Sequence, residues 1–237
     1  MSETRATLAK RRADVAAMFD TVATRYDLMN SLMTAGVVEK WRKDVIEAID
    51  PQPGQRILDL AAGTGSSSAP LAEAGAHVFP TDMSLGMLRV GKQRHPHMDF
   101  IAGDALNLPY ADDSFDVVTI SYGLRNVEQT EDALRELLRV TRPGGQVLIC
   151  EFSTPTNPVF RKAYDGVLNG VIPALSKGFA SNKAAYGYLA ESIQAWPAQR
   201  TLADLMTRAG WRAVGWQNLT GGIVALHRAW KPAPEDY

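Results

Sequence analysis

The residues best suited to chemistry are two glycines and two acids that follow apolar stretches of the chain. Gly63-Thr64-Gly65 directly follows one such stretch, and Asp82 and Asp104 each follow another. Glycines at a strand-to-helix turn let the backbone approach a ligand closely, and the first N–H groups of a helix lack intrahelical partners. A carboxylate after the next strand can accept two hydroxyl hydrogen bonds from a ribose. Together these residue types are typical of a nucleoside site.

The glycine spacing argues against a pyrophosphate ligand. A dinucleotide-binding fingerprint reads Gly-x-Gly-x-x-Gly. Ala61 stands at the position of its first glycine, and Ser67 and Ser68 stand where the third would fall. The turn alone is a weak indicator and is also compatible with a purely structural role. Asp82 could likewise serve only to cap the helix that we expect to begin near Ser84.

The residues that follow the third predicted strand suit an adenine, and the fourth strand ends in a small polar residue. Asp104 can accept a hydrogen bond from an exocyclic amine, and the small side chain of Ala105 leaves room for the ring. Ser121 ends the fourth strand. Because the carboxyl ends of parallel strands meet at one edge of a sheet, we expect these residues to lie beside Gly63 and Asp82.

Strand and helix patterns alternate along most of the chain, which predicts a parallel sheet with crossover helices. We expect helices over 1–54 and a doubly wound α/β domain over 55–237, interrupted by an aromatic-rich helical insertion at 154–198. Its seven-stranded sheet closes with an antiparallel hairpin through Thr220-Gly221-Gly222. The predicted strands are 56–61, 77–82, 98–103, 115–121, 145–152, 211–219 and 223–230. The predicted helices are 15–29, 39–49, 67–75, 84–94, 131–141 (capped by Thr130) and 202–209.

Composition limits the partners that we expect. The 237 residues carry a net charge of -1, so no basic field favours nucleic acid. No apolar run reaches the roughly 18 residues of a spanning helix, and the basic N-terminus lacks a signal-peptide core, so we expect a cytoplasmic protein. The single cysteine, Cys150, excludes an intramolecular disulfide and is expected in the core. His95 and His97 lack accompanying acids, so we expect no metal site.

Three longer motifs carry a resemblance to a known family. The first runs from Met18-Phe19-Asp20 through Arg25-Tyr26-Asp27-Leu28-Met29-Asn30 to Trp41-Arg42, the second is 118–127, and the third is 218–227. With the Gly63 turn and the two acids, they resemble class I S-adenosylmethionine-dependent methyltransferases. More narrowly, they resemble the ubiquinone/menaquinone biosynthesis C-methyltransferase family, over about residues 15–232.

The resemblance implies a cofactor, a substrate and a reaction. It implies S-adenosylmethionine bound by Gly63, Thr64, Asp82, Asp104, Ala105 and Ser121. The acid at 104, residues 153–157 and the glycines at 221 and 222 resemble menaquinone-type members, which implies ring-carbon methylation of a demethylmenaquinol in menaquinone biosynthesis. C-methylation of a ubiquinone-precursor benzoquinol, O- or N-methylation of a small aromatic molecule, and a non-catalytic cofactor- or lipid-binding subunit remain alternatives.

The candidate catalytic residues are Arg125 and Asn126, which follow the fourth predicted strand, and Tyr26, which could hydrogen-bond the cofactor or substrate. A group near the substrate phenol must accept its proton or stabilise the phenolate. Arg125 could stabilise the phenolate and hold a water, or it could form a salt bridge with Glu128 or Glu151. Tyr26 could instead be a core residue. His227 is the one histidine considered as a base, but it could also be an interior histidine. No metal is needed, because the leaving group departs neutral.

The implied substrate also suggests a membrane neighbour. A polyprenylated naphthoquinol resides in the bilayer, so we expect peripheral contact with the inner face of the membrane through the first helices or residues 160–180. The sequence shows no clear basic amphipathic stripe, so this expectation depends on the substrate. The insertion could cover the quinol ring and its tail, or be only a helical cap on the sheet. A homodimer is compatible with the sequence.

Overall fold

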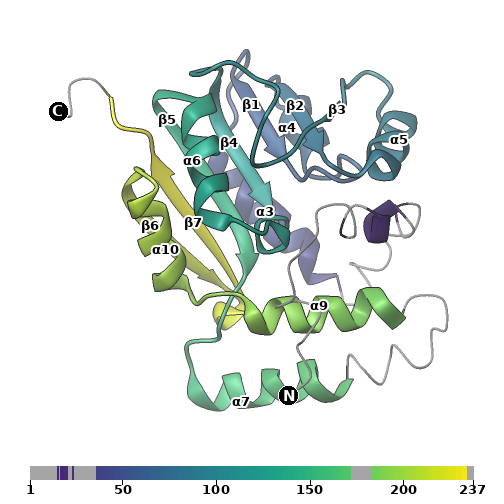
Figure 1. The fold of residues 1–237 in the computed structure, drawn as a ribbon, viewed down its shortest axis with the longest axis vertical. Helices are drawn as coiled ribbons and strands as arrows, with labels where there is room; N and C mark the ends of the chain where they lie inside the picture. Colours follow the sequence, from purple (N-terminus) through teal and green to yellow (C-terminus); the bar gives the residue numbers. More distant parts are fainter. Residues whose placement is uncertain (1–14, 16, 21–22, 24–35, 172–182, 234–237) are drawn as a thin grey trace.

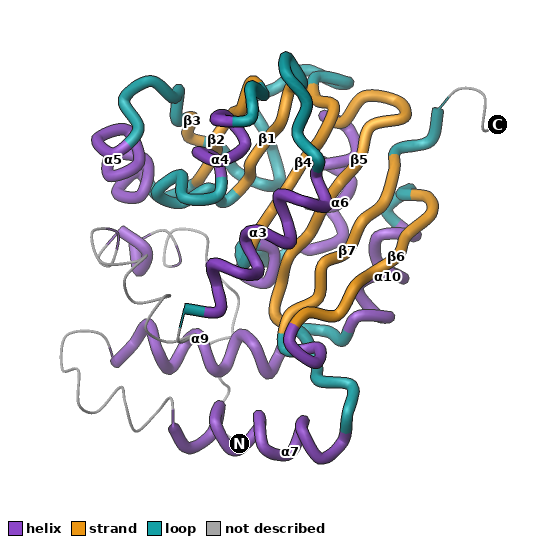
Figure 2. The backbone as a smooth tube through the Cα atoms, turned by 180° about the vertical axis from the view of Figure 1, so that it is seen from behind, coloured by secondary structure: helices purple, strands orange, loops and turns teal. Residues whose placement is uncertain are grey.

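The computed structural model describes residues 15, 17–20, 23, 36–171 and 183–233, which form one twisted sheet between layers of helices (Figures 1 and 2). The strand order is β3-β2-β1-β4-β5-β7-β6. The first five strands run parallel, and β7 is antiparallel to both β5 and β6. The predicted doubly wound sheet with its C-terminal hairpin is therefore confirmed. The strands are β1 Arg56–Leu60, β2 His77–Asp82, β3 Ile101–Ala102, β4 Phe115–Ser121, β5 Thr141–Phe152, β6 Arg212–Leu219 and β7 Val224–Trp230.

Helices cover both faces of the sheet, as its residue pattern requires. The neighbouring residues Val117 and Val118 of β4 are both buried but belong to different clusters, because successive side chains of a strand point to opposite faces. Val118 shares its cluster with Leu134 and Met206, and Val117 shares its cluster with Trp41. The helices are α3 Val37–Ile49, α4 Ser68–Glu73, α5 Leu85–Arg94, η2 Leu124–Asn126, α6 Thr130–Val140, α7 Pro158–Gly166, η3 Val167–Val171, α9 Lys183–Ala195, α10 Gln199–Arg208 and η4 Thr220–Gly222.

Strand β3 is much shorter than the predicted 98–103. Only Ile101–Ala102 pairs with β2. The amide of Met98 donates to the carbonyl of His95 at 3.0 Å, and Lys92 Nζ donates to the Met98 carbonyl at 2.7 Å. These contacts hold the segment before Ile101 in a turn, so Met98 is buried and Phe100 half-buried without joining the sheet.

Three predicted boundaries are also wrong. Strand β5 begins at Thr141, directly after α6 ends, rather than at residue 145. The intervening Gly144 has φ +74°, and its amide donates to the carbonyl of Lys231 at 3.0 Å, so contacts with the end of β7 extend the strand. Thr130 is the first residue of α6 rather than its cap, and α10 begins at Gln199 rather than at residue 202.

The insertion contributes helices at the end of the sheet where β5 ends. Figures 1 and 2 show α7 and α9 running below the sheet. Gln194 Nε2 of α9 donates to Asn169 Oδ1 of η3 at 2.9 Å, which ties the two segments together. Among the described helices, none is long and apolar enough to cross a membrane. Most of the predicted helix 15–29, including Tyr26, lies outside the described residues.

Candidate functional site

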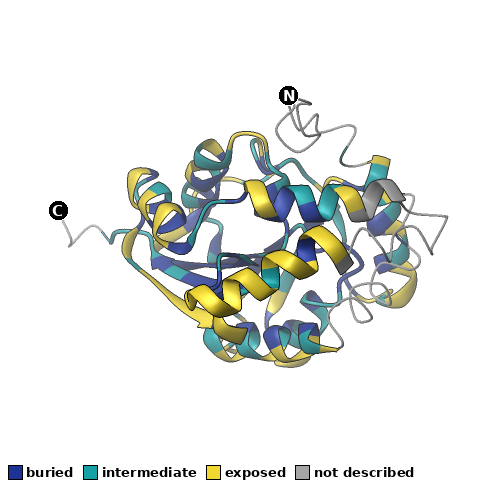
Figure 3. Ribbon diagram, turned by 90° about the horizontal axis from the view of Figure 1, so that it is seen from below, coloured by how far each residue is buried: buried dark blue, intermediate teal, exposed yellow. Residues whose placement is uncertain are grey.

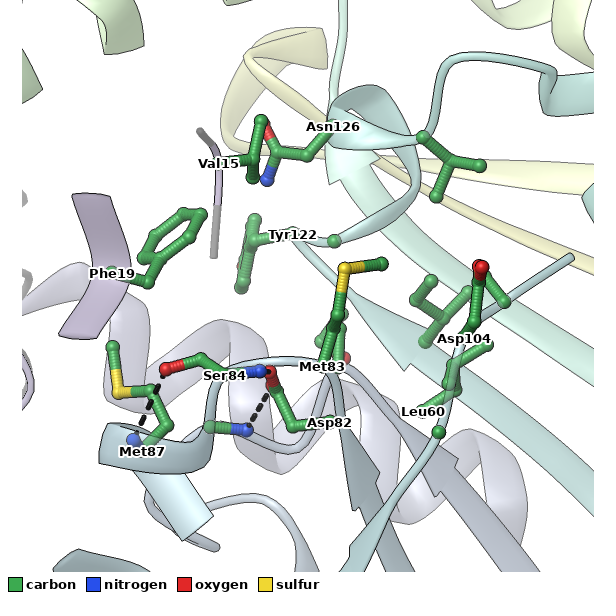
Figure 4. Close-up of a pocket in the computed structure, with 18 of the residues that line it drawn as sticks. Val15, Phe19, Leu60, Asp82, Met83, Ser84, Met87, Asp104, Tyr122 and Asn126 are labelled. Carbon is green, nitrogen blue, oxygen red and sulfur yellow. Dashed lines mark hydrogen bonds between the residues drawn. The ribbon is translucent and has the colours of Figure 1, made fainter. Parts of the chain in front are cut away.

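One pocket collects the predicted cofactor residues at the carboxyl edge of the parallel strands. It holds about 830 Å³ of empty space, which includes the part open to solvent. Val15 and Phe19 close the pocket from the side opposite Met83 and Asp104 (Figure 4). The sequence predicts a helix for these two residues but no place in a site. Five predicted cofactor residues line the pocket: Gly63, Asp82, Asp104, Ala105 and Ser121.

Asp82 connects the glycine turn to the start of α5. Its Oδ2 accepts a hydrogen bond from the amide of Gly63 at 2.9 Å, and its Oδ1 accepts one from the amide of Ser84 at 2.8 Å (Figure 4). The capping side chain of α5 is Ser84, whose Oγ accepts from the amide of Met87 at 3.1 Å. Burial raises the pKa of the Asp82 carboxyl above its ordinary value, while the backbone hydrogen bonds act in the opposite direction. Asp82 therefore does more than cap a helix.

The glycine turn requires backbone conformations that other residues rarely adopt. Gly63 and Gly65 have φ +57° and +83°. A Cβ atom on Gly65 would also lie 2.6 Å from the Phe100 ring, which is far inside van der Waals contact. Both requirements favour glycine.

Asp59 lies beneath this turn and binds the two serines that stand where a dinucleotide motif has its third glycine. Its side chain is 1% exposed, and its Oδ2 accepts hydrogen bonds from Ser67 Oγ at 2.7 Å and Ser68 Oγ at 2.5 Å. Its Oδ1 has no partner among the described residues. Burial raises the pKa of the Asp59 carboxyl to about 6. Asp59 and the serines thus brace the turn from inside the protein.

Substituting Asp59 with asparagine is expected to change the pH dependence of stability. The folded protein binds this proton more tightly than the unfolded chain, so the free energy of unfolding falls as pH rises from about 4 to about 6. The loss is up to about 3 kcal/mol and should be absent in Asp59→Asn. Urea unfolding at several pH values measures it. Asp99→Asn is the matched control, because the Asp99 side chain is 94% exposed. Identical pH slopes for the wild type and Asp59→Asn would contradict the buried titration.

A second pocket lies on the other side of the glycine turn and contains Thr64. It also holds Arg42, Ser66 and the hydroxyl of Thr119, which has no partner among the described residues. Arg42 pairs with Glu39 at 2.5 Å, and its side chain remains 24% exposed. A guanidinium beside hydroxyl groups is suited to a carboxylate ligand. In the sequence, Arg42 stands out only as part of a motif. It lies beside the glycine turn because of the way in which α3 packs against the sheet.

Tyr122 forms a wall shared by the two pockets. It has φ +57°, which is uncommon for a residue other than glycine and is typical of functional sites when the surroundings enforce it. Its ring lies 6.2 Å from Trp41 and 5.4 Å from Phe152, centroid to centroid. Its amide donates to the carbonyl of Cys150 at 2.8 Å. The ring packing and this hydrogen bond together hold the backbone in its strained conformation.

Arg125 lies behind the pocket and forms a buried ion pair with Glu151. The two side chains are 5% and 1% exposed, and the Nη1–Oε1 distance is 3.0 Å. Nη1 also donates to the carbonyl of Tyr122. Of the two alternatives for a salt bridge, the structure therefore selects Glu151 rather than Glu128. Arg125 does not line the pocket, whereas the next residue, Asn126, does.

Asn126 connects the pocket to the insertion. Its Oδ1 accepts a hydrogen bond from the hydroxyl of Tyr188 at 3.1 Å. Tyr188 belongs to α9, so the insertion reaches the site through this contact. None of the described residues within 154–198 lines the pocket itself.

His227 is the interior histidine that the sequence left open. It is 1% exposed on β7, and its Nε2 lies 2.9 Å from the carbonyl of Gln199. Burial lowers its pKa below the ordinary value. Cys150 is buried as expected, with its thiol pKa raised to about 12 by burial. The rings of His95 and His97 lie 6.3 Å apart, and no cluster of three metal-ligating side chains occurs in the described part of the chain.

Comparison with known proteins identifies the family. The model of the ubiE/COQ5 methyltransferase family matches residues 6–231. The chain belongs to the ubiE/COQ5 methyltransferase family. A demethylmenaquinone methyltransferase of Streptomyces avermitilis is 57% identical to this family member, over 96% of the chain and 99% of the relative.

Solved structures show the fold of this ubiE/COQ5 family member. A SAM-dependent methyltransferase of Thermotoga maritima has a TM-score of 0.64 at 18% identity, covering 91% of this chain and 99% of that one. Phosphoethanolamine N-methyltransferase 2 of Haemonchus contortus, in complex with S-adenosyl-L-methionine, has a TM-score of 0.59 at 18% identity, covering 81% and 52%. The expected class I methyltransferase fold is confirmed.

The motifs that carried the resemblance to the ubiE/COQ5 family meet in space. Trp41 Nε1, from the first motif, donates to Thr220 Oγ1 of the third at 2.8 Å. Phe19, also in the first motif, and Asn126, in the second, line the same pocket. The third motif is therefore structural: its Thr220 turn supports α3, and a Cβ on Gly221 would lie 2.8 Å from the ring of Phe160 in α7.

Proposed function

We propose that this protein transfers the methyl group of S-adenosylmethionine to a ring carbon of a demethylmenaquinol, as a step in menaquinone biosynthesis. The observation that carries the proposal is the meeting of Gly63, Asp82 and Asp104 at one pocket, in a chain 57% identical to a demethylmenaquinone methyltransferase. Proteins of this fold methylate many different acceptors. The proposed acceptor is therefore inferred from the relatives, and the proposed cofactor from the pocket.

The residues present fit the cofactor. S-adenosylmethionine supplies an electrophilic methyl group on a sulfonium sulfur. Asp82 would hold the ribose hydroxyls, and Asp104 with Ala105 would hold the adenine. Arg42 and Thr64, in the adjoining pocket, would hold the methionine carboxylate. The unpartnered hydroxyl of Thr119 in that pocket is a further polar group available to the ligand.

The proposed catalytic residues act in different ways. Asn126 lines the pocket and would hold the quinol hydroxyl through its amide group, while Tyr188 fixes the orientation of that amide. Arg125 lies behind the pocket, where its guanidinium binds Glu151 and the carbonyl of Tyr122. From there its positive charge would stabilise a phenolate formed in the pocket. Tyr26 lies outside the described residues, and its proposed role is a hydrogen bond to the cofactor or substrate.

Methyl transfer is expected to require a reductant. A ring carbon attacks the methyl group only if it is electron-rich, so the hydroquinol should react and the oxidised quinone should not. The experiment supplies labelled S-adenosylmethionine and demethylmenaquinone with and without dithionite, and follows label in the extracted quinone. Equal rates in the two conditions would contradict the mechanism.

The same assay separates the alternatives. A demethylated ubiquinone-precursor benzoquinol in competition tests the acceptor, and NMR of the product locates the methyl group on carbon, oxygen or nitrogen. Label on oxygen or nitrogen would indicate a different methyltransferase, and no turnover with any acceptor would indicate a binding subunit. We further propose that the enzyme meets its polyprenylated substrate through peripheral contact with the inner face of the membrane.

A further inference from the structure

Helix α7 is unusual in this fold because it buries none of its residues. Val159 is 81% exposed, and Val167, at the start of η3, is 43% exposed. With the exposed Ala163 they are spaced four residues apart, which places all three on one side of the helix. Seen from below, α7 is almost entirely coloured as exposed, whereas α9 beside it shows buried residues (Figure 3). We call Val159, Ala163 and Val167 the outer face of α7.

One basic residue, Lys162, lies at the edge of this outer face, about 100° around the helix axis from its centre, whereas Arg161 lies about 160° from that centre, on the side of Leu168. Arg161 and Lys162 are both exposed, and neither forms an ion pair with another described residue. Asp165 is the only acid in the helix. Exposed apolar residues beside lysine and arginine are typical of helices that lie in the interface of a membrane with anionic lipids.

The opposite side of this segment faces the functional site. Leu168 is 3% exposed, and Tyr164 is half-buried with its pKa raised to about 12 by burial, an effect that the nearby charge of Arg125 opposes. The contact between Asn169 and Gln194 links the segment to α9, whose Tyr188 bonds the pocket residue Asn126. The segment α7–η3 therefore lies between solvent and the site that is proposed to bind the quinol.

We propose that the outer face of α7 docks on an anionic lipid bilayer, with its apolar side chains among the lipid headgroups and with Lys162 against the lipid phosphates. This inference extends the proposed function, since a polyprenylated acceptor resides in the bilayer. Docking through α7 would bring the pocket close to the membrane surface where the quinol head emerges. The charge of Lys162 at the edge of the outer face favours an anionic bilayer over an apolar protein surface as the occupant.

Vesicle sedimentation tests the docking. Full-length protein is mixed with vesicles of phosphatidylglycerol and phosphatidylcholine in equal parts, and with phosphatidylcholine alone. Val159→Glu with Val167→Glu is expected to weaken binding to the anionic vesicles by at least about tenfold. Lys162→Gln is expected to weaken it by about fivefold and to leave binding to neutral vesicles unchanged, whereas Arg161→Gln, on the opposite side of the helix, should weaken it less. Trp216→Glu is the matched control, because Trp216 is 40% exposed on β6.

Three results would overturn the docking proposal. In the first, the double glutamate variant binds anionic vesicles as tightly as the wild type. In the second, Trp216→Glu loses as much binding as that variant. In the third, the wild type is a dimer that binds no vesicles, and the double glutamate variant is a monomer. A short-tailed, water-soluble demethylmenaquinol separates this inference from the proposed function. Wild type and glutamate variant should methylate it at equal rates, whereas only the variant should lose activity on a long-tailed quinol in vesicles. If neither protein methylates the soluble quinol, the proposed function fails while the sedimentation result still decides the docking.

Discussion

Replacing Asp82 with alanine is expected to remove most of the stabilisation that S-adenosylmethionine gives the wild-type protein. Hydrogen bonds to a charged group contribute roughly 1.5–3 kcal/mol each, so losing two ribose contacts should weaken binding at least about 100-fold. At a cofactor concentration about 100 times the wild-type Kd, mass action stabilises the wild type by about 2.7 kcal/mol and the variant by only about 0.4 kcal/mol. Thermal unfolding with and without the cofactor measures the difference.

Asp20→Ala is the matched control for this experiment. Asp20 Oδ1 accepts hydrogen bonds from Ser84 Oγ and from the amide of Gly86, so it supports the start of α5 as Asp82 does. Asp20 does not line the pocket. If both variants lower the melting temperature but only Asp82→Ala loses the cofactor response, Asp82 binds the ligand. An undiminished cofactor response in Asp82→Ala would remove it from the ribose site.

Replacing Arg125 with alanine is expected to destabilise the protein by about 3–5 kcal/mol. The substitution leaves the Glu151 carboxylate buried without its ion pair, and the cost of an unpaired buried charge is of this size. Urea unfolding measures the loss directly. Arg135→Ala is the control, because Arg135 is 52% exposed and its ion pairs on the surface of α6 should contribute less than about 1 kcal/mol.

A double variant separates the stability of this ion pair from its effect on the reaction. Arg125→Met with Glu151→Leu replaces both charges by apolar side chains, which is often neutral for stability. We expect the double variant to fold and to bind S-adenosylmethionine nearly as well as the wild type, but to have a much lower kcat, because Tyr122 and Asn126 lose the group that positions them. If kcat recovers along with stability, Arg125 is only structural. A lowered cofactor affinity at unchanged kcat would also exclude the proposed role.

The sequence by itself determined the order of strands, turns and acids. Each of these depends on spacing within a short segment: an apolar strand, the glycines at 63 and 65 that allow positive φ, and an acid directly after the next strand. Parallel strands then bring their carboxyl ends to one edge, so Asp82 and Asp104 had to lie near Gly63. The turn residues Thr220-Gly221-Gly222 between two extended runs indicated the C-terminal hairpin in the same way. The sequence did not determine the lengths of the segments. A buried segment that pairs with no neighbouring strand has the same apolar pattern as a strand, as the residues before Ile101 do.

Only the tertiary structure decided the contacts between distant segments. Arg125 had two acids within reach in the sequence, and the pairing of β4 with β5 placed Glu151, not Glu128, against it. The packing of α3 brought Arg42 to the glycine turn, and the position of β7 inside the sheet made His227 an interior residue. The exposure of Val159 likewise followed from the absence of any described element over that side of α7. Local spacing specifies which residues stand at a strand end, but partners and exposure depend on the packing of the whole chain.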